Sequence, residues 1–199
     1  MIRRSIVLLF PLVFASFTDQ ALPARGWTRI ENCRFLENPS NDGDSFHVVA
    51  NRRKRIFRLY FVDCPETSDH NKAMKARIAE QAKEFGLTTS EVMDIGKQAA
   101  KFTSSLLQKA NTFTVITRWE DAKGDSDKKR NYAYVLVNGR GLDEQLVEAG
   151  LARVYGRQID IPEHVLPPRG LKGYKHQRHL LSVQKEAKRN RRGAWKRAF

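Results

Sequence analysis

Cysteine is scarce in this chain of 199 residues, which contains only Cys33 and Cys64. Two cysteines in a domain of this size do not make a disulfide framework, so the fold must depend on a buried core. The sequence also has no cluster of Cys and His residues of the kind that binds zinc. A single bridge between Cys33 and Cys64 and two free thiols are both open alternatives.

Long apolar runs are absent, apart from a short one at the N-terminus. Two arginines at positions 3 and 4 precede a mostly apolar segment, residues 5–17, which is too short to span a bilayer comfortably. This pattern is typical of a signal peptide, and we expect residues 1–24 to be removed by cleavage after Ala24 rather than Ala15. Retention as an uncleaved anchor is the alternative. The expected protein is exported, either secreted or periplasmic, with no stable membrane association after cleavage.

Acidic residues are few relative to basic ones. The chain has 22 Asp and Glu against 36 Lys and Arg, a formal net charge of +14 and a pI of about 10.1. Such a balance favours a polyanionic partner, nucleic acid first and an anionic membrane surface second, although it also serves simple solubility. The chain has no internal repeat and no low-complexity linker. Its length therefore predicts a single domain over residues 25–199.

The hydrophobic pattern predicts a β-rich α+β protein. Alternation between turn signals predicts five strands, at residues 27–36, 44–50, 55–62, 112–119 and 131–137. Helical spacing predicts helices at residues 69–86, 90–110, 143–150 and 173–192. Five short strands with a helix between the third and fourth are typical of a Greek-key barrel of the oligonucleotide-binding (OB) type.

The second and third strands should form a hairpin through a polar turn at residues 51–54. If the turn centres near residues 52 and 53, Asp44 lies opposite Phe61 and Asp63 follows just beyond. Both carboxylates then reach the open end of the hairpin. Simple alternation places Arg58 on the face opposite Asp44, so a twist or bulge would be needed to bring the two together.

Carboxylates at one end of a hairpin suggest a metal-assisted reaction. Two close anionic groups repel unless a cation lies between them, and Ca²⁺ with several water ligands suits them better than Zn²⁺. Asp42 can add a further or water-mediated ligand, or the sequence Asp42-Gly43-Asp44 can be only a turn. Glu66, in a loop stiffened by Pro65, is a candidate general base that would deprotonate water for attack on phosphorus.

In their order along the chain, these motifs resemble the signature of the staphylococcal (thermo)nuclease family. The resemblance rests on Asp42-Gly43-Asp44-Ser45, the run Arg58–Thr67, Arg130 before Tyr132-Ala133-Tyr134, the run Leu146–Ala152, and Trp195. It covers about residues 27–197. It implies a five-stranded OB-fold barrel with three main helices. The stretch Ser68–Asp94 is longer than in the staphylococcal enzyme, and we expect this insertion to be an extra surface helix rather than a rim of the substrate groove.

The resemblance also implies a calcium site. Asp44 and Asp63 would be carboxylate ligands, the backbone carbonyl of Cys64 would be a further ligand, and Asp42 would act through water. Cys64 stands where the family often has threonine, a change that a backbone contact should tolerate.

The same resemblance implies catalytic and substrate-binding residues. Glu66 would be the general base, while Arg58 and Arg130 would bind the phosphate and stabilise its developing charge. Lys128 lies near the position of a base-stacking tyrosine in the staphylococcal enzyme. Two alternatives follow: Tyr155 compensates, or base preference is weaker and contacts to the nucleic-acid backbone dominate.

The resulting prediction is an exported, Ca²⁺-dependent, sugar-nonspecific nuclease. It would hydrolyse DNA and RNA, leave 3′-phosphate ends and act as a monomer. The alternative is a catalytically inactive nucleic-acid-binding module of the same fold.

Overall fold

The structure is a computed structural model that describes residues 26–123 and 129–197. In these residues five strands form a closed barrel: β1 (Thr28–Phe35), β2 (Ser45–Ala50), β3 (Arg53–Leu59), β5 (Phe113–Thr117) and β6 (Asn131–Val137). Hydrogen-bonded neighbours follow the order β3-β2-β1-β5-β6, and a parallel pairing of β3 with β6 closes the barrel. The predicted α+β fold with an OB-type barrel is confirmed.

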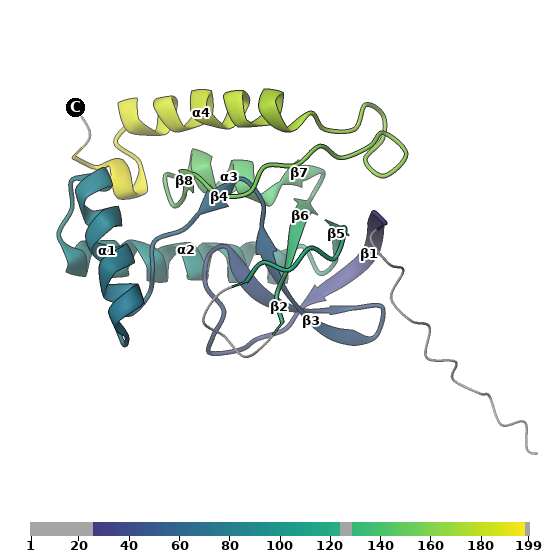
Figure 1. Cartoon of the computed structure of the whole chain (residues 1–199), viewed down its shortest axis with the longest axis horizontal. Helices are drawn as coiled ribbons and strands as arrows, with labels where there is room; N and C mark the ends of the chain where they lie inside the picture. The colour runs from purple at the N-terminus through teal and green to yellow at the C-terminus, as the bar shows by residue number, and fades with distance from the viewer. Residues whose placement is uncertain (1–25, 124–128, 198–199) are drawn as a thin grey trace, which may run out of the picture.

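Four α-helices accompany the barrel in the described part of the chain: α1 (Lys72–Phe85), α2 (Thr89–Lys109), α3 (Leu142–Glu148) and α4 (Gly173–Arg189). Figure 1 shows α4 running along one side of the molecule beyond α3, whereas α1 stands beside one end of α2. A capping box of Thr88 and Glu91 starts α2, and Gly86 ends α1 in the left-handed conformation. The three main helices and the helical insertion match the prediction.

Three very short strands and one 3₁₀ turn complete the described elements. They are β4 (Val62–Asp63), β7 (Arg140–Gly141), β8 (Arg153–Val154) and η1 (Gly193–Trp195). The antiparallel pairing of β4 with β8 matters most, since it places Arg153 directly opposite Asp63.

The hairpin register differs from the prediction by two residues. The turn is centred on Asn51 and Arg52, which both have positive φ angles of 49° and 60°, as in tight two-residue hairpins. Asp44 consequently lies opposite Leu59, whose N–H donates to the Asp44 carbonyl at 2.8 Å, and not opposite Phe61. A shift of two residues keeps every side chain on its predicted face.

The predicted strand at residues 55–62 is also interrupted. The strand β3 ends at Leu59, and Phe61 adopts a left-handed φ of 69° before the chain enters β4. This break redirects the chain so that Asp63 turns back toward the end of the hairpin.

The barrel interior and the space under the helices form one hydrophobic core. Phe46, Val48 and Phe57 are fully buried on the predicted inner face, and Trp195 packs edge-on against Phe85. Both cysteines are buried free thiols, and burial raises the pKa of Cys33 to about 11. None of the helices in the described ranges is long and apolar enough to cross a membrane.

Candidate active site

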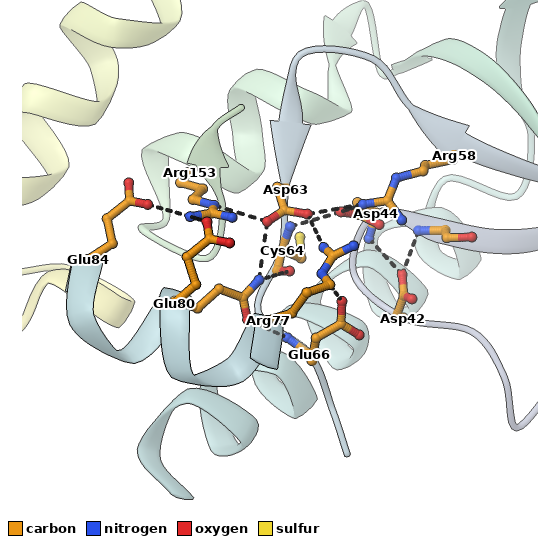
Figure 2. A network of polar contacts seen from close by, with 12 residues as sticks. Asp42, Asp44, Arg58, Asp63, Cys64, Glu66, Arg77, Glu80, Glu84 and Arg153 are labelled. Atoms are coloured by element: carbon orange, nitrogen blue, oxygen red, sulfur yellow. Dashed lines mark hydrogen bonds and ion pairs between the residues drawn. The ribbon is translucent and has the colours of Figure 1, made fainter. Parts of the chain in front are cut away.

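Arg58 connects two of the predicted carboxylates. Its Nη2 atom lies 3.3 Å from Asp44 Oδ2 and 3.0 Å from Asp63 Oδ1 (Figure 2). The negative charge of Asp44 raises the pKa of Arg58, which stays protonated. The two side chains meet although simple alternation puts them on opposite faces, and they do so where Asp44 precedes the first residue of β2.

The Asp42-Gly43-Asp44 segment forms a tight turn. The Asp42 carboxylate accepts hydrogen bonds from the backbone N–H groups of Asp44, at 3.1 Å, and Ser45, at 2.6 Å. A Cβ atom on Gly43 would lie 2.6 Å from Cys64 Sγ, so only glycine fits at this close approach. The segment therefore forms a turn, and a water-mediated metal contact by Asp42 stays a prediction.

Hydrogen bonds to Asp63, Cys64 and Glu66 hold the loop that follows β4. The Cys64 N–H donates to Asp44 Oδ2 at 2.8 Å. The amide nitrogen of Gln81 donates to Asp63 Oδ2 and to the Cys64 carbonyl, both at 3.1 Å, and its oxygen accepts from the Glu66 N–H at 3.1 Å. Gln81 is fully buried, so these bonds fix the geometry of the loop.

Glu66 lies where its loop crosses α2. The crossing occurs at Gly96, where a Cβ atom would lie 2.6 Å from the Pro65 carbonyl oxygen and closer still to that of Glu66. The Glu66 carboxylate is mostly buried and contacts Arg77 Nε at 2.9 Å. Burial raises the pKa of Glu66, and the nearby charges of Asp44 and Asp63 act in the same direction.

The helix α1 contributes directly to the site. Arg77 Nη2 lies 2.6 Å from Asp63 Oδ1, so this side chain bridges Asp63 and Glu66 (Figure 2). The expectation of an extra surface helix without a role at the groove is wrong. The available signal was the i, i+4 spacing of Arg77 and Gln81, which puts two polar side chains on one face of an amphipathic helix.

Arg153 is a further site residue that the sequence did not reveal. Its Nε atom lies 3.0 Å from Asp63 Oδ2, and its guanidinium also pairs with Glu80, at 2.9 Å, and with Glu84. The ring of Tyr155 stacks on the Arg153 guanidinium at 4.4 Å. This contact is set by the pairing of β4 with β8, which no local pattern indicated.

A cleft beside this network contains the remaining predicted residues that the structure describes. Arg130 and Tyr155 line it together with Arg58, Asp63 and Arg77. Arg130 Nη2 donates to the carbonyl of residue 123 at 2.8 Å. The structure therefore brings both predicted phosphate-binding arginines to one cleft. The predicted substrate-binding residue at position 128, a lysine, lies outside the described residues.

The donor set suits a hard divalent cation. The carboxylates of Asp44 and Asp63 and the carbonyl of Cys64 are oxygen ligands of the type that Ca²⁺ prefers. Within residues 26–123 and 129–197, no three Asp, Glu, His or Cys side chains already converge as a metal-binding group. A cationic nitrogen of Arg58 instead stands between Asp44 and Asp63. Burial raises the pKa of Asp44 despite this arginine.

These features define a class of protein: an OB-fold barrel whose hairpin end gathers carboxylates and arginines beside a cleft suited to a phosphate group. The model of the family described as staphylococcal nuclease homologue matches residues 56–197, more than half of the chain. The chain therefore belongs to the staphylococcal nuclease family. Asp42 and Asp44 precede the matched range, so the assignment of Asp44 depends on its contacts with Arg58 and Cys64, and that of Asp42 on its hydrogen bonds to the backbone of Asp44 and Ser45.

The chain is also similar to two curated proteins, of which the first is named as an endonuclease. The endonuclease YncB of Bacillus subtilis (strain 168) is 32% identical over 115 residues, which cover 57% of this chain and 44% of that protein. The uncharacterized protein MJ1439 of Methanocaldococcus jannaschii is 26% identical over 159 residues, which cover 77% of this chain and 67% of that protein. The chain thus spans less than half the length of the Bacillus endonuclease.

Proposed function

We propose that this protein is an exported, Ca²⁺-dependent, sugar-nonspecific nuclease that hydrolyses DNA and RNA and leaves 3′-phosphate ends. The observation that carries the proposal is the continuous network from Asp44 through Arg58 and Asp63 to Glu66, at a cleft that Arg130 also lines. Membership of the nuclease family and the endonuclease name of the Bacillus relative support the same reaction class. The net charge of +14 suits a polyanionic substrate.

The residues have distinct roles in this mechanism. Asp44, Asp63 and the Cys64 carbonyl would hold the cation, with Asp42 acting through water. A bound Ca²⁺ would offset the charge of the phosphoryl oxygens and orient the substrate. Glu66 would take a proton from the attacking water, and its raised pKa suits a base that must accept a proton in the reaction.

The arginines and Tyr155 would act on the substrate. Arg58 and Arg130 would donate hydrogen bonds to the phosphoryl oxygens and stabilise charge that develops during in-line attack. Tyr155, at 56% exposure the most open side chain of this group, offers a ring face for an unpaired base. A cleft of this kind fits one strand better than a duplex, so we expect single-stranded nucleic acid to be cleaved faster than double-stranded.

A second candidate is a nucleic-acid-binding module without catalysis. The observation in its favour is that arginines already engage Asp44, Asp63 and Glu66, and that no ready-made metal group exists among the described residues. Such a module would bind DNA through its basic surface and would need no metal.

Digestion of single-stranded DNA distinguishes the two candidates. The purified protein is assayed with Ca²⁺ and with chelator, beside Glu66→Gln and the control Glu163→Gln, which alters an exposed glutamate in the proline-rich loop. Cleavage only with Ca²⁺, reduced about 10²-fold or more in Glu66→Gln and unchanged in the control, supports the nuclease. Retention of DNA without cleavage in either condition supports the binding module.

Export is tested separately by the intact mass of the protein recovered outside the cytoplasm of an expression host. Cleavage after Ala24 predicts a chain of residues 25–199. Recovery of the complete chain in the membrane fraction would instead support an uncleaved anchor.

A further inference from the structure

The carboxylate of Asp63 is saturated with hydrogen-bond donors. Oδ1 accepts from Arg58 at 3.0 Å and from Arg77 at 2.6 Å, while Oδ2 accepts from Gln81 at 3.1 Å and from Arg153 at 3.0 Å. An ionised carboxylate has about four lone-pair sites, so these donors fill it. A cation that binds Asp63 must therefore displace one of the four donors.

Three of these donors are firmly held. Gln81 is fully buried and makes three hydrogen bonds to the loop. The Arg153 side chain is 4% exposed and is also paired with two glutamates of α1. The Arg58 side chain is 16% exposed and also contacts Asp44. Loss of Gln81 or Arg58 from Asp63 would leave further buried partners unsatisfied, and loss of Arg153 would leave its own buried guanidinium without this partner.

Arg77 is the donor that can most easily move away from Asp63. Its side chain is 40% exposed, and its described contacts are to Asp63 and Glu66, the predicted metal ligand and the candidate base. Because this long, flexible side chain is already partly exposed, it can move into water without moving the helix. Its departure would open one lone-pair site on Asp63 and free the Glu66 carboxylate for a water molecule at the same time.

We propose that Arg77 is an exchangeable internal counter-ion, which neutralises Asp63 and Glu66 in the metal-free protein and is displaced when the divalent cation binds. This inference rests on the proposed function, from which it takes the cation. Arg77 is a positioning residue here, since it acts through the two carboxylates. It lowers the affinity for the metal and keeps the candidate base ordered until the metal binds.

The test is calorimetric titration of Ca²⁺ into the metal-free protein, into Arg77→Met and into Arg157→Met. Arg157 is a matched control because it lines the same cleft and is 51% exposed, but pairs with Glu120 instead. Removal of a competing ion pair should tighten Ca²⁺ binding by Arg77→Met about five-fold or more, in line with about 1 kcal/mol for an exposed pair. Arg157→Met should stay within about two-fold of the wild type, since a more distant charge is screened.

The outcomes separate this inference from the proposed function. Ca²⁺ binding that is equal or weaker in Arg77→Met, beside clear wild-type binding, overturns the counter-ion role and leaves the nuclease proposal intact. Absence of Ca²⁺ binding in both proteins overturns both. If Arg77→Met fails to fold, Arg77→Lys replaces it, because a lysine keeps the charge but cannot bridge Asp63 and Glu66 with a planar fork. Binding by Arg77→Lys that is no tighter than wild type then overturns the inference.

Discussion

The backbone carbonyl of Glu66 lies against Gly96 in α2 so closely that no Cβ atom fits between them. The loop that carries the candidate base is thus positioned by direct backbone packing on a helix, and not only by its own hydrogen bonds. A glycine in the middle of a helix normally costs about 1 kcal/mol relative to alanine. At position 96 the absence of a side chain permits the backbone contact that positions Glu66.

Gly96→Ala should therefore reduce activity, although the same change in an ordinary helix would stabilise it. The added methyl group must push the Pro65–Glu66 backbone away, and misplacement by about 1 Å can cost about 10²-fold in rate. The measurement is Ca²⁺-dependent hydrolysis of single-stranded DNA, with urea unfolding as a check on folding. Lys97→Ala, one residue along the helix and exposed, should retain activity. Full activity of Gly96→Ala would contradict this account of the loop.

Arg153→Met should destabilise the fold. The substitution leaves one lone pair of the buried Asp63 carboxylate without a hydrogen-bond donor, which typically costs about 1–3 kcal/mol. The free energy of unfolding in urea gives the magnitude. Arg140→Met is the comparison, because Arg140 is 51% exposed and its pairs with two glutamates should contribute less than about 1 kcal/mol. An equal loss of unfolding free energy in Arg153→Met and Arg140→Met would show that the buried ion pair of Arg153 with Asp63 contributes no more than an exposed one.

The stability of the metal-free protein should depend on pH through Glu66. Burial raises the pKa of Glu66 above its ordinary value of 4.5, so the folded protein keeps this proton at pH values where the unfolded chain has lost it. The contribution of Glu66 to stability therefore falls as pH rises from about 4.5 through its raised folded pKa. Thermal unfolding of wild type and Glu66→Gln across this range should show a difference that widens with pH. A constant difference between the unfolding temperatures of the two proteins at all pH values would contradict a contribution from Glu66.

Tyr155→Ala should weaken binding of single-stranded substrate. Stacking of one base on an aromatic ring contributes about 1–3 kcal/mol, so KM should rise about 5- to 100-fold with a smaller change in kcat. Tyr155→Phe keeps the ring and should behave like the wild type. Tyr174→Ala, which removes a similarly exposed ring from α4, is the matched control and should leave KM unchanged. A similar rise in KM for both alanine variants would point to general surface effects.

The local motifs carried much of the site. A turn at Asp42-Gly43-Asp44, an apolar strand with Arg58 in it, and an acidic loop after it are each encoded within a few residues. Period-2 alternation fixes which face each side chain takes, so the hairpin faces were predictable even though the register was wrong by two residues. The role of Arg130 followed only from the family resemblance, because by its sequence context alone Arg130 is one more charge in a basic run.

The contacts of Asp63 show where prediction from the sequence ended. Arg58 is five residues away, but Arg77, Gln81 and Arg153 come from an inserted helix and from a strand 90 residues further along. No period or spacing relates such segments, because their approach depends on how α1 packs against the barrel and on the pairing of β4 with β8. The insertion was recognisable as a helix, but its face toward the site was not.

Short-range periodicity and composition encode the β-rich barrel with its helices, the basic charge and the local acid and arginine motifs, so these features follow from the sequence. The tertiary structure alone decided that Asp63 is fully occupied by donors, that Arg77 is the most exposed of its arginine partners, and that Gly96 positions Glu66. These depend on the close packing of segments distant in the chain, where a difference of one ångström decides which atoms touch.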